Sequence, residues 1–266
     1  MTPAQAKAAG EALFQAEAAG SQIGMLSLAH PGMTLDDAYA VQAALVARKL
    51  AAGRRGIGWK IGLTSRAMQD ALKIETPDSG ILFDDMLFRD GATVPAGRFI
   101  QPRVEAEIAF ILNAPLMGAG VTREDVLPAT EAVAPSLEIL DTRILRVDPA
   151  SGAIRKVTDT IADNAANAGI VLGTQRHAPA DVDLRWAGAI VKRDGVVEET
   201  GLGAGVLNDP VQGILWLVQR LAHYGHGLSA GDIVLSGSFI RPIEAPPGSR
   251  FDADFGGFGH VSIQFA

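Results

Sequence analysis

Apolar residues follow two different periods along the chain, and the change falls near residue 55. Residues 2–20 are rich in Ala, Gln, Glu and Lys, which favour helix. Residues 33–53 carry apolar side chains at roughly helical spacing, with Thr34 as the candidate N-cap and Gly53 as a natural stop. The pattern therefore predicts an N-terminal helical portion over residues 1–55.

Beyond this portion, short apolar runs alternate with Gly, Pro and Asp, which is typical of strands separated by turns. Helices are predicted at 122–133 and at 209–225, where Val211, Leu215, Val218 and Leu221–Ala222 share one side. Strands are predicted at 56–65, 103–112, 137–145, 168–174, 186–195, 232–243 and 260–266. Many strands with few helices indicate an α+β fold with a mixed or antiparallel β-rich core over residues 56–266.

Composition and charge narrow the classes of function. A chain of 266 residues with 48% hydrophobic and 20% charged residues is typical of a globular protein. The net charge of −7 makes a basic nucleic-acid surface unexpected, and the lack of cysteine excludes disulfides and cysteine metal sites. Neither a signal peptide nor an apolar run of about 18 residues is present, so we expect a cytoplasmic protein without a membrane partner.

Two glutamates stand out in the predicted strand "RVEAEIAFIL". Because side chains alternate across a strand, Glu105 and Glu107 face one way, about 7 Å apart at Cα, while Val104 and Ile108 face the other. Two like charges on the same face of a core strand need protonation, cationic partners or a metal. An edge strand with a solvated acidic face is the alternative.

A third acid, Glu138, lies in the apolar run "AVAPSLEILD". Three strand-borne carboxylates and no cysteine suit a hard cation with oxygen ligands, Mg²⁺ or Mn²⁺ rather than Zn²⁺. Three protein oxygens would leave positions for a bidentate small ligand and a water. A paired structural charge is the alternative for Glu138.

Several other polar residues are candidates for catalysis or substrate binding, and for each a purely structural role is equally simple. Lys60 in "GWKIG" either has a pKa lowered by apolar surroundings, suiting acid–base work, or reaches out to water. Asp78 in "TPDSG" is also typical of a turn. Asn164 in "DNAANAG" indicates either cap chemistry or a polar pocket wall, and Ser236 and Ser238 in "SGSF" offer hydroxyls that could hold a carboxylate.

Other familiar sites are not supported. The glycines of "GLGAG" follow no clear strand of a βαβ unit, so they do not indicate a nucleotide site. No G-x-S-x-G motif predicts a hydrolase triad, and the five histidines lack paired metal spacing.

Several stretches in one order carry a family resemblance: "GWKIGLTSRAMQ", "PRVEAEIAF", "LEILDTRI", "DTIADNAANAGIVLG", "GVLNDPVQGILWL" and "AGDIVLSGSF". From about Leu35 to its end, the chain resembles the 2-keto-4-pentenoate hydratase group of the fumarylacetoacetate hydrolase superfamily. The resemblance implies a mixed β-roll or barrel core and homo-oligomers, often pentamers or decamers. It also implies Mg²⁺ or Mn²⁺ at Glu105, Glu107 and Glu138, with Lys60 and Asp78 in acid–base roles.

The function implied is hydration of a 2-hydroxy-2,4-dienoate in meta-cleavage catabolism of aromatic compounds, and a seven-carbon dicarboxylate is the expected substrate. Arg143 is the expected partner of its second carboxylate, with Arg103 as the alternative and a structural ion pair possible for either. Ser79 and Asp209 depart from the residues expected in close relatives and leave the shape of the substrate pocket open.

Competing functions of three kinds stay open. A monocarboxylate hydratase or a 4-oxalocrotonate decarboxylase would use the same metal site. Acylpyruvate hydrolysis would need a His–Glu pair, of which the helical portion shows no sign. A non-catalytic partner subunit is the third, although the complete acidic set with Lys60 argues against it.

Overall fold

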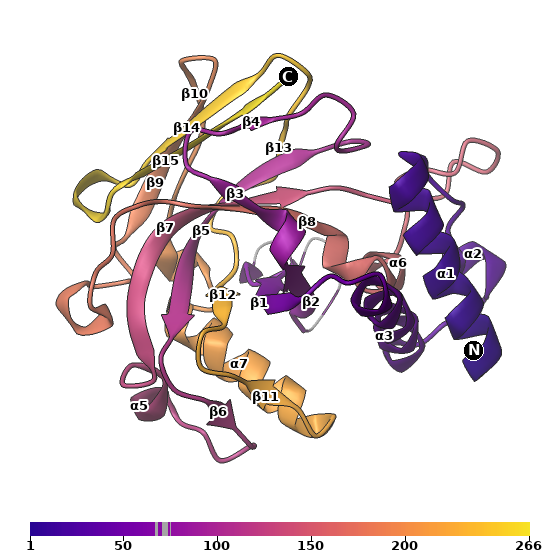
Figure 1. Cartoon of the computed structure of the whole chain (residues 1–266), viewed down its shortest axis with the longest axis horizontal. Coiled ribbons are helices and arrows are strands. Elements are labelled where there is room, and N and C mark those ends of the chain that lie inside the picture. Colours follow the sequence, from indigo (N-terminus) through magenta and orange to yellow (C-terminus); the bar gives the residue numbers. More distant parts are fainter. Residues whose placement is uncertain (67–68, 71–73, 75) are drawn as a thin grey trace.

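The computed structural model describes residues 1–66, 69–70, 74 and 76–266. The stretch "GWKIGLTSRAMQ" therefore lies only partly within the described residues. Figure 1 shows two parts: a group of helices that includes the N-terminus, and a larger body of curved sheets that includes the C-terminus.

Three helices occupy the N-terminal portion: α1 (Pro3–Ala19), α2 (Leu26–Ala29) and α3 (Leu35–Ala51). The predicted N-cap of α3 is confirmed, because the Thr34 hydroxyl accepts the Asp37 N–H at 3.1 Å. Such a cap satisfies an amide that the first helical turn leaves without a partner. Both long helices therefore begin and end close to the predicted residues.

The N-terminal helices share their core with later residues. Leu13 of α1 and Val41 and Leu45 of α3 are fully buried in one apolar cluster that also contains Ile144 and Ile161. Ile161 belongs to α6 (Val157–Ala162), which Figure 1 shows beside α3. The division at residue 55 remains a prediction, since this helical cluster is built from both sides of it.

The strands form two main sheets and a small pair. The larger sheet has the order β2-β1-β12-β5-β7-β8-β3, with β13 also paired to β5, and the second has the order β10-β9-β14-β15-β4. The strands of the larger sheet are β1 (Gly56–Gly62), β2 (Asp78–Phe83), β3 (Leu87–Arg89), β5 (Arg103–Leu112), β7 (Thr130–Leu140), β8 (Asn167–Leu172), β12 (Ile233–Leu235) and β13 (Ile243–Glu244). Those of the second sheet are β4 (Thr93–Val94), β9 (Gly188–Arg193), β10 (Val196–Leu202), β14 (Arg250–Asp254) and β15 (His260–Phe265). The pair is β6 (Leu116–Met117) with β11 (Gly227–Leu228).

Strand directions confirm a mixed sheet. The β1–β12 and β3–β8 pairs are parallel, whereas β5 is antiparallel to both β7 and β12. The fold is therefore α+β with mixed sheets, and a doubly wound parallel sheet is excluded, as the strand-rich pattern predicted.

The long strand β5 lies inside the larger sheet, and its bounds match the prediction. Val104, Ala106, Ile108 and Phe110 on one face are fully buried in the main core. That core extends to the second sheet through residues such as Val191 and Phe251. Because side chains alternate along a strand, Glu105 and Glu107 lie on the opposite face of β5, away from this apolar core.

Helix α7 (Pro210–His223) also packs on the main core. Asp209 caps it by accepting the Val211 N–H at 3.0 Å. The apolar stripe is turned slightly from the predicted one: Ile214 and Leu217 are fully buried, while Leu215 is only half-buried.

Three predicted elements differ from the structure. Only the short helix α5 (Arg123–Val126) forms within 122–133, because Thr130 already begins β7. The strand predicted at 137–145 ends at Leu140, and the one predicted at 232–243 divides into β12 and β13. Proline in 122–133 and serine and glycine in 232–243 interrupt patterns that looked continuous.

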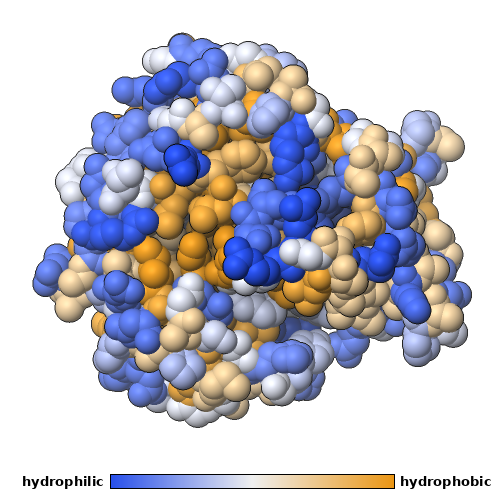
Figure 2. Space-filling view, viewed as in Figure 1, coloured by the Kyte–Doolittle hydropathy of each residue, from blue (hydrophilic) through white to orange (hydrophobic). Residues whose placement is uncertain are grey.

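The face seen in Figure 2 gathers apolar residues in its left-centre part, with hydrophilic residues around them. In Figure 1 the sheet strands occupy that part of the view. No helix among the described residues is long and apolar enough to cross a membrane.

Candidate active site

Four neighbouring strands of the larger sheet bring the predicted ionisable residues together. Register pairs Glu105 of β5 directly with Glu138 of β7, and Gly62, two residues after Lys60 on β1, with Asp78 of β2. Strand β12 lies between β1 and β5 and joins these two halves of the site. Residues from 60 to 138 thus meet on one sheet.

The three glutamates form a compact cluster. Each offers a carboxylate oxygen, and these oxygens lie within 4.8 Å of one another. Glu107 and Glu138 are fully buried and Glu105 is half-buried. The alternative of a solvated acidic edge is therefore wrong, because β5 has neighbours on both sides and its acidic side chains are enclosed.

Three of the glutamate oxygens have no hydrogen-bond partner among the described residues. Among the described residues, Glu107 Oε1 and both oxygens of Glu138 are buried without a hydrogen bond, although the Lys60 ammonium lies 3.4 Å from Glu138 Oε1. Leaving buried charged oxygens unpaired is costly, so such a group needs a ligand. Clustered carboxylate oxygens with free lone pairs fit a hard divalent cation.

The electrostatics of the cluster agree with this fit. Burial and the Glu138 carboxylate raise the pKa of Glu105 to about 8. Burial and the same neighbour raise the pKa of Glu107 well above its usual range, and burial raises that of Glu138. Without a cation, burial and the neighbouring carboxylates therefore favour the protonated form of these groups, whereas a bound cation would favour the ionised form.

Lys60 is buried rather than turned to water, with 3% of its side chain exposed. Burial lowers its pKa, but the carboxylates of Glu138 and Asp78 act more strongly and raise the pKa above its ordinary value. The lowered pKa suggested by its apolar sequence neighbours is therefore wrong, because the lysine's nearest partners in space are acids. The neighbouring carboxylates therefore favour the protonated, positively charged form of Lys60 beside Glu138.

Asp78 begins β2 and is 1% exposed, so it is not an exposed turn residue. Burial raises its pKa, while the Lys60 and Arg155 charges act against that rise. Its Oδ1 is buried without a hydrogen bond among the described residues. A side chain on Gly62 would press on Asp78 and on the Lys60 ammonium, so glycine is required where these two groups meet.

The "SGSF" loop contributes through its backbone. The Gly237 N–H donates to Glu107 Oε2 at 2.8 Å, with Gly237 at a φ of 113° that a larger residue would strain. The Ser236 hydroxyl is buried, and no described residue pairs with it, so it is free to meet a ligand. The Ser238 hydroxyl instead donates to the Ile240 carbonyl at 2.8 Å.

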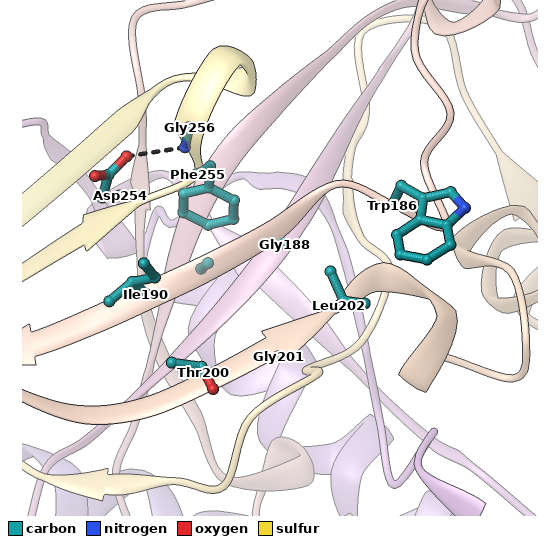
Figure 3. Close-up of a pocket in the computed structure, with 10 residues that line it drawn as sticks. Trp186, Gly188, Ile190, Thr200, Gly201, Leu202, Asp254, Phe255 and Gly256 are labelled. Carbon is teal, nitrogen blue, oxygen red and sulfur yellow. Dashed lines mark hydrogen bonds between the residues drawn. The ribbon is translucent and has the colours of Figure 1, made fainter.

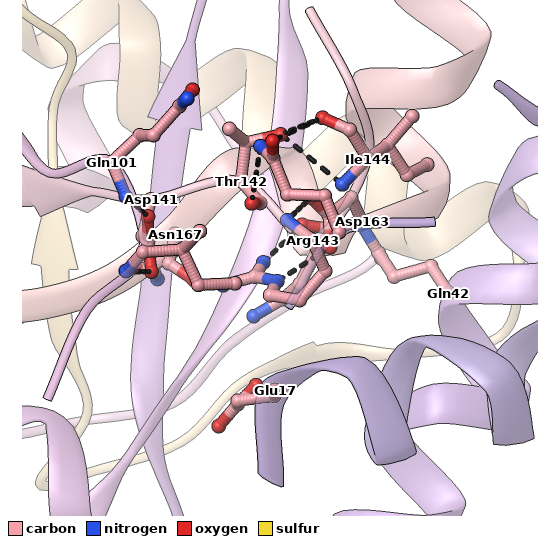
Figure 4. A network of polar contacts seen from close by, with 12 residues as sticks. Glu17, Gln42, Gln101, Asp141, Thr142, Arg143, Ile144, Asp163 and Asn167 are labelled. Carbon is pink, nitrogen blue, oxygen red and sulfur yellow. Dashed lines mark hydrogen bonds and ion pairs between the residues drawn. The ribbon is translucent and has the colours of Figure 1, made fainter. Parts of the chain in front are cut away.

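Arg143 forms a structural ion pair with Asp163 (Figure 4). This was the alternative to its expected role as the partner of the second carboxylate of the substrate. Its Nε donates to Asp163 Oδ1 at 2.5 Å, its Nη2 donates to the Asp163 carbonyl at 2.6 Å, and the residue is 2% exposed. The Asn164 amide is likewise engaged: Nδ2 donates to the Ile81 carbonyl at 2.9 Å, and Oδ1 accepts the Ile81 N–H at 2.8 Å. Both residues hold the fold together, and their side chains are not free to bind a substrate.

Sequence reasoning missed two participants. Gly62 could have been noticed as a glycine two positions after the lysine in a predicted strand. Arg155, whose charge reaches Asp78, follows a turn-rich stretch that carries no periodic signal.

A pocket among the described residues lies away from the cluster of glutamates, on the second sheet. It encloses about 430 Å³ and is lined by residues that include Trp186, Ile190, Leu202 and Phe255 (Figure 3). Asp254 is the one carboxylate among its described lining residues, so this pocket is separate from the cluster of glutamates.

Comparison with known proteins identifies relatives over nearly the whole chain. No family model matches it. The chain is 50% identical over 253 residues to the 2-oxo-hept-4-ene-1,7-dioate hydratase of Escherichia coli, covering 95% of each protein. Several 2-keto-4-pentenoate hydratases follow at 40 to 42% identity.

Among solved structures, 4-oxalocrotonate decarboxylase from Pseudomonas putida G7, complexed with magnesium and adipate, superposes with a TM-score of 0.93. It is 33% identical and matches 100% of this chain and 99% of its own. Fumarylpyruvate hydrolase from Pseudomonas aeruginosa matches 80% of this chain and 89% of its own at a TM-score of 0.59. At 15% identity that match shows the fold alone, and it confirms the predicted fumarylacetoacetate-hydrolase-like architecture.

Proposed function

This chain belongs to the 2-keto-4-pentenoate hydratase family, hydro-lyases of dienoate intermediates in aromatic catabolism, and we propose that it converts 2-oxo-hept-4-ene-1,7-dioate to 4-hydroxy-2-oxoheptanedioate. The 50% identical Escherichia coli hydratase supports this substrate over the monocarboxylates. The corresponding pathway would be meta-cleavage degradation of homoprotocatechuate and 4-hydroxyphenylacetate.

One observation carries the proposal: three buried glutamates with unpaired oxygens, beside a buried lysine and a buried aspartate. We propose that Glu105, Glu107 and Glu138 hold Mg²⁺, with Mn²⁺ as a substitute. The magnesium in the decarboxylase structure and the all-oxygen donor set support this assignment. Such an ion supplies Lewis acidity at the α-oxo acid end of the substrate and favours its enolate.

Lys60 and Asp78 would move the protons. The reaction first transfers a proton from C3 of the substrate to C5, which brings the C=C bond into conjugation with the C2 carbonyl. Asp78 is suited to exchange a proton because burial raises its pKa above the ordinary value and its Oδ1 has no described partner. Lys60 keeps its proton and would stabilise negative charge on the substrate oxygens.

Water then adds to C4, where conjugation with the carbonyl places positive character. The hydroxyl forms a bond to C4 and a proton goes to C3, so one molecule of water is consumed and nothing is released. The Ser236 hydroxyl is free to orient the water or the substrate carboxylate. Gly237 would hold Glu107 in place through its N–H. Ser238, Arg143 and Asn164 are not proposed to bind substrate, because their polar groups are already engaged.

Product analysis tests the assignment against the rival reaction. The purified chain with Mg²⁺ should consume 2-hydroxyhepta-2,4-dienedioate and form a product heavier by one water, without CO₂. Decarboxylation is the second candidate because of the 0.93 TM-score with 4-oxalocrotonate decarboxylase. Release of CO₂ from 2-oxohex-3-enedioate, without hydration of either compound, would replace the hydratase by the decarboxylase.

We also propose that the chain is a cytoplasmic homo-oligomer, as the family resemblance implies. Exposed apolar side chains on the second sheet support an oligomer: Trp186 is 73% exposed and Val196 is 66% exposed. Light scattering would test it, and a monomer at micromolar concentration would reject the oligomer.

A further inference from the structure

Three arginines meet at one end of β5. Arg103 begins that strand, while Arg146 and Arg155 flank a hairpin-like connection whose backbone pairs Arg155 N–H with the Arg146 carbonyl at 3.1 Å. Glu244, opposite Arg103 in the sheet, lies 2.7 Å from the Arg103 guanidinium and 3.7 Å from that of Arg146. Two segments, β5 and the connection between residues 146 and 155, therefore place their cations together.

Among the described residues, Glu244 is the carboxylate that pairs with the arginine cluster, while Asp163 and Asp141 act on Arg155 and Arg146 from farther away. Glu244 is shared by two arginines and its side chain is 67% exposed, while Arg155 Nη1 donates to the neutral Thr142 hydroxyl at 2.7 Å. Among the described residues, Nε of Arg103 and Nε of Arg146 are buried without a hydrogen-bond partner. Burial and the Arg103 and Arg155 charges lower the pKa of Arg146 to about 10. These features favour an added carboxylate, because guanidinium groups bind one through paired N–H donors.

The cluster lies next to the glutamates. Arg103 and Glu105 are two residues apart on the same face of β5, about 7 Å at Cα. Arg103 acts on the pKa of Glu105 and Arg155 acts on that of Asp78, each against the rise caused by burial. The cations therefore face the same region as the acid–base and chelating groups.

The spacing suits a particular length of substrate. Six C–C bonds separate the two carboxylate carbons of a seven-carbon diacid, as many backbone bonds as in two extended residues, so they span about 7 Å. One end at Glu105 would place the other end near Arg103. A five-carbon monoacid is shorter and has no charge at its far end.

From this arrangement we infer that Arg103, Arg146 and Arg155 bind the distal carboxylate of the substrate and select dicarboxylates over monocarboxylates. The inference rests on the proposed hydratase function and adds the residues that determine its substrate class. Glu244 holds Arg103 and Arg146 in position, and the substrate carboxylate supplies the missing charge.

The test compares two substrates in the same variants. Arg146→Gln and Arg155→Gln should each lower the ratio of kcat/KM for 2-hydroxyhepta-2,4-dienedioate over 2-hydroxypenta-2,4-dienoate by about 10- to 100-fold, mainly through KM of the diacid, because each removes a charge-assisted bond. Arg155→Lys, which keeps the charge, should recover part of that ratio. Arg241→Gln removes an exposed arginine that pairs with Glu199, and it is the matched control, with an unchanged ratio.

A binding measurement distinguishes failure of the arginine assignment from failure of the proposed hydratase function. With Mg²⁺ present, calorimetry should show weaker adipate binding to both Gln variants and unchanged binding of oxalate, which has no distal carboxylate to place. A ratio that stays constant in both variants, or equal losses for diacid and monoacid, would overturn the arginine assignment. Failure of the unaltered protein to hydrate either compound would instead reject the proposed function.

Discussion

Two buried clusters of charged residues differ in their hydrogen bonding: in one the charged groups have partners, and in the other some of the described carboxylate oxygens do not. In the first, Arg143 and Asp163 satisfy one another through side-chain and backbone hydrogen bonds, and Figure 4 shows the guanidinium enclosed by them. In the second, Glu107 and Glu138 are equally buried, yet three of their oxygens have no hydrogen bond among the described residues.

This difference in hydrogen bonding distinguishes charged residues that stabilise the fold from charged residues that serve to bind a ligand. A buried pair whose hydrogen bonds are complete needs nothing more, and its removal damages the fold. A buried cluster of like charges is unfavourable alone and becomes favourable only with a ligand, so its removal should damage activity and spare the fold. Burial and charge alone would not have told the two clusters apart.

The largest expected effect comes from the unsatisfied cluster. Glu107→Gln keeps the size of the side chain and an oxygen to accept the Gly237 N–H, but removes one ligand charge. We expect kcat to fall about 1,000-fold or more, because the electrostatic stabilisation of the enolate is lost. Thermal unfolding without metal should occur at the same or a higher temperature, because like-charge repulsion decreases. Wild-type rates would refute the site.

The satisfied cluster should respond in the opposite way. Arg143→Met leaves Asp163 buried without its cation, so we expect the free energy of unfolding to fall by about 3–5 kcal/mol. Urea denaturation measures this loss, and Arg143→Met with Asp163→Asn should recover part of it. A folded, stable Arg143→Met protein with a raised KM for the diacid alone would return Arg143 to a substrate-binding role.

Strand alternation was enough to single out the proposed metal ligands, since Glu105 and Glu107 stand two apart in an apolar strand and Glu138 interrupts another. It could not predict their pairing, because the register of Glu105 with Glu138 depends on how distant strands meet. The same limit explains Arg143 and Asn164, which looked like polar pocket residues until Asp163 and Ile81 proved to be their partners.

The proposed acid–base pair, Lys60 and Asp78, was singled out in the sequence for reasons that the structure supports only in part. Lys60 was noticed for its apolar sequence neighbours, yet its environment is set by Glu138 and Asp78, which are 18 or more residues away in the chain. Asp78 looked like a turn residue because "TPDSG" has turn composition, and its place in β2 depends on pairing with β1. The local sequence pattern is enough to single out such residues. Their charge state, however, depends on the residues that the tertiary structure places beside them.

A smaller effect tests how closely Lys60 and Asp78, the proposed acid–base groups, are held together. Gly62→Ala would place a methyl group against Asp78 and within about 3.0 Å of the Lys60 ammonium, so these groups must shift. We expect kcat to fall about 10-fold or more and unfolding to cost about 1–3 kcal/mol less, as in other overpacked cores. Gly56→Ala, on the same strand with its nearest neighbour 3.9 Å away, is the control and should change neither quantity appreciably.

The smallest effect is the pH dependence of stability, and it follows from the unsatisfied cluster alone. Burial and Glu138 raise the pKa of Glu105 to about 8, so between its ordinary value of 4.5 and 8 the folded protein keeps a proton that the unfolded chain releases. The contribution of this group to stability is therefore complete below pH 4.5 and is lost as the pH rises through 8. Glu107 and Glu138 act in the same direction.

Without metal, the melting temperature should fall by several degrees between pH 6 and 9. With saturating Mg²⁺ the dependence should reverse, because the ion binds the ionised carboxylates and binds more tightly as they lose protons. Scanning calorimetry with EDTA and with Mg²⁺ measures both curves, and Glu107→Gln should bring them together. Parallel curves in the unaltered protein would mean that these carboxylates do not bind the ion, and the contrast with the Arg143–Asp163 pair would then lose its functional meaning.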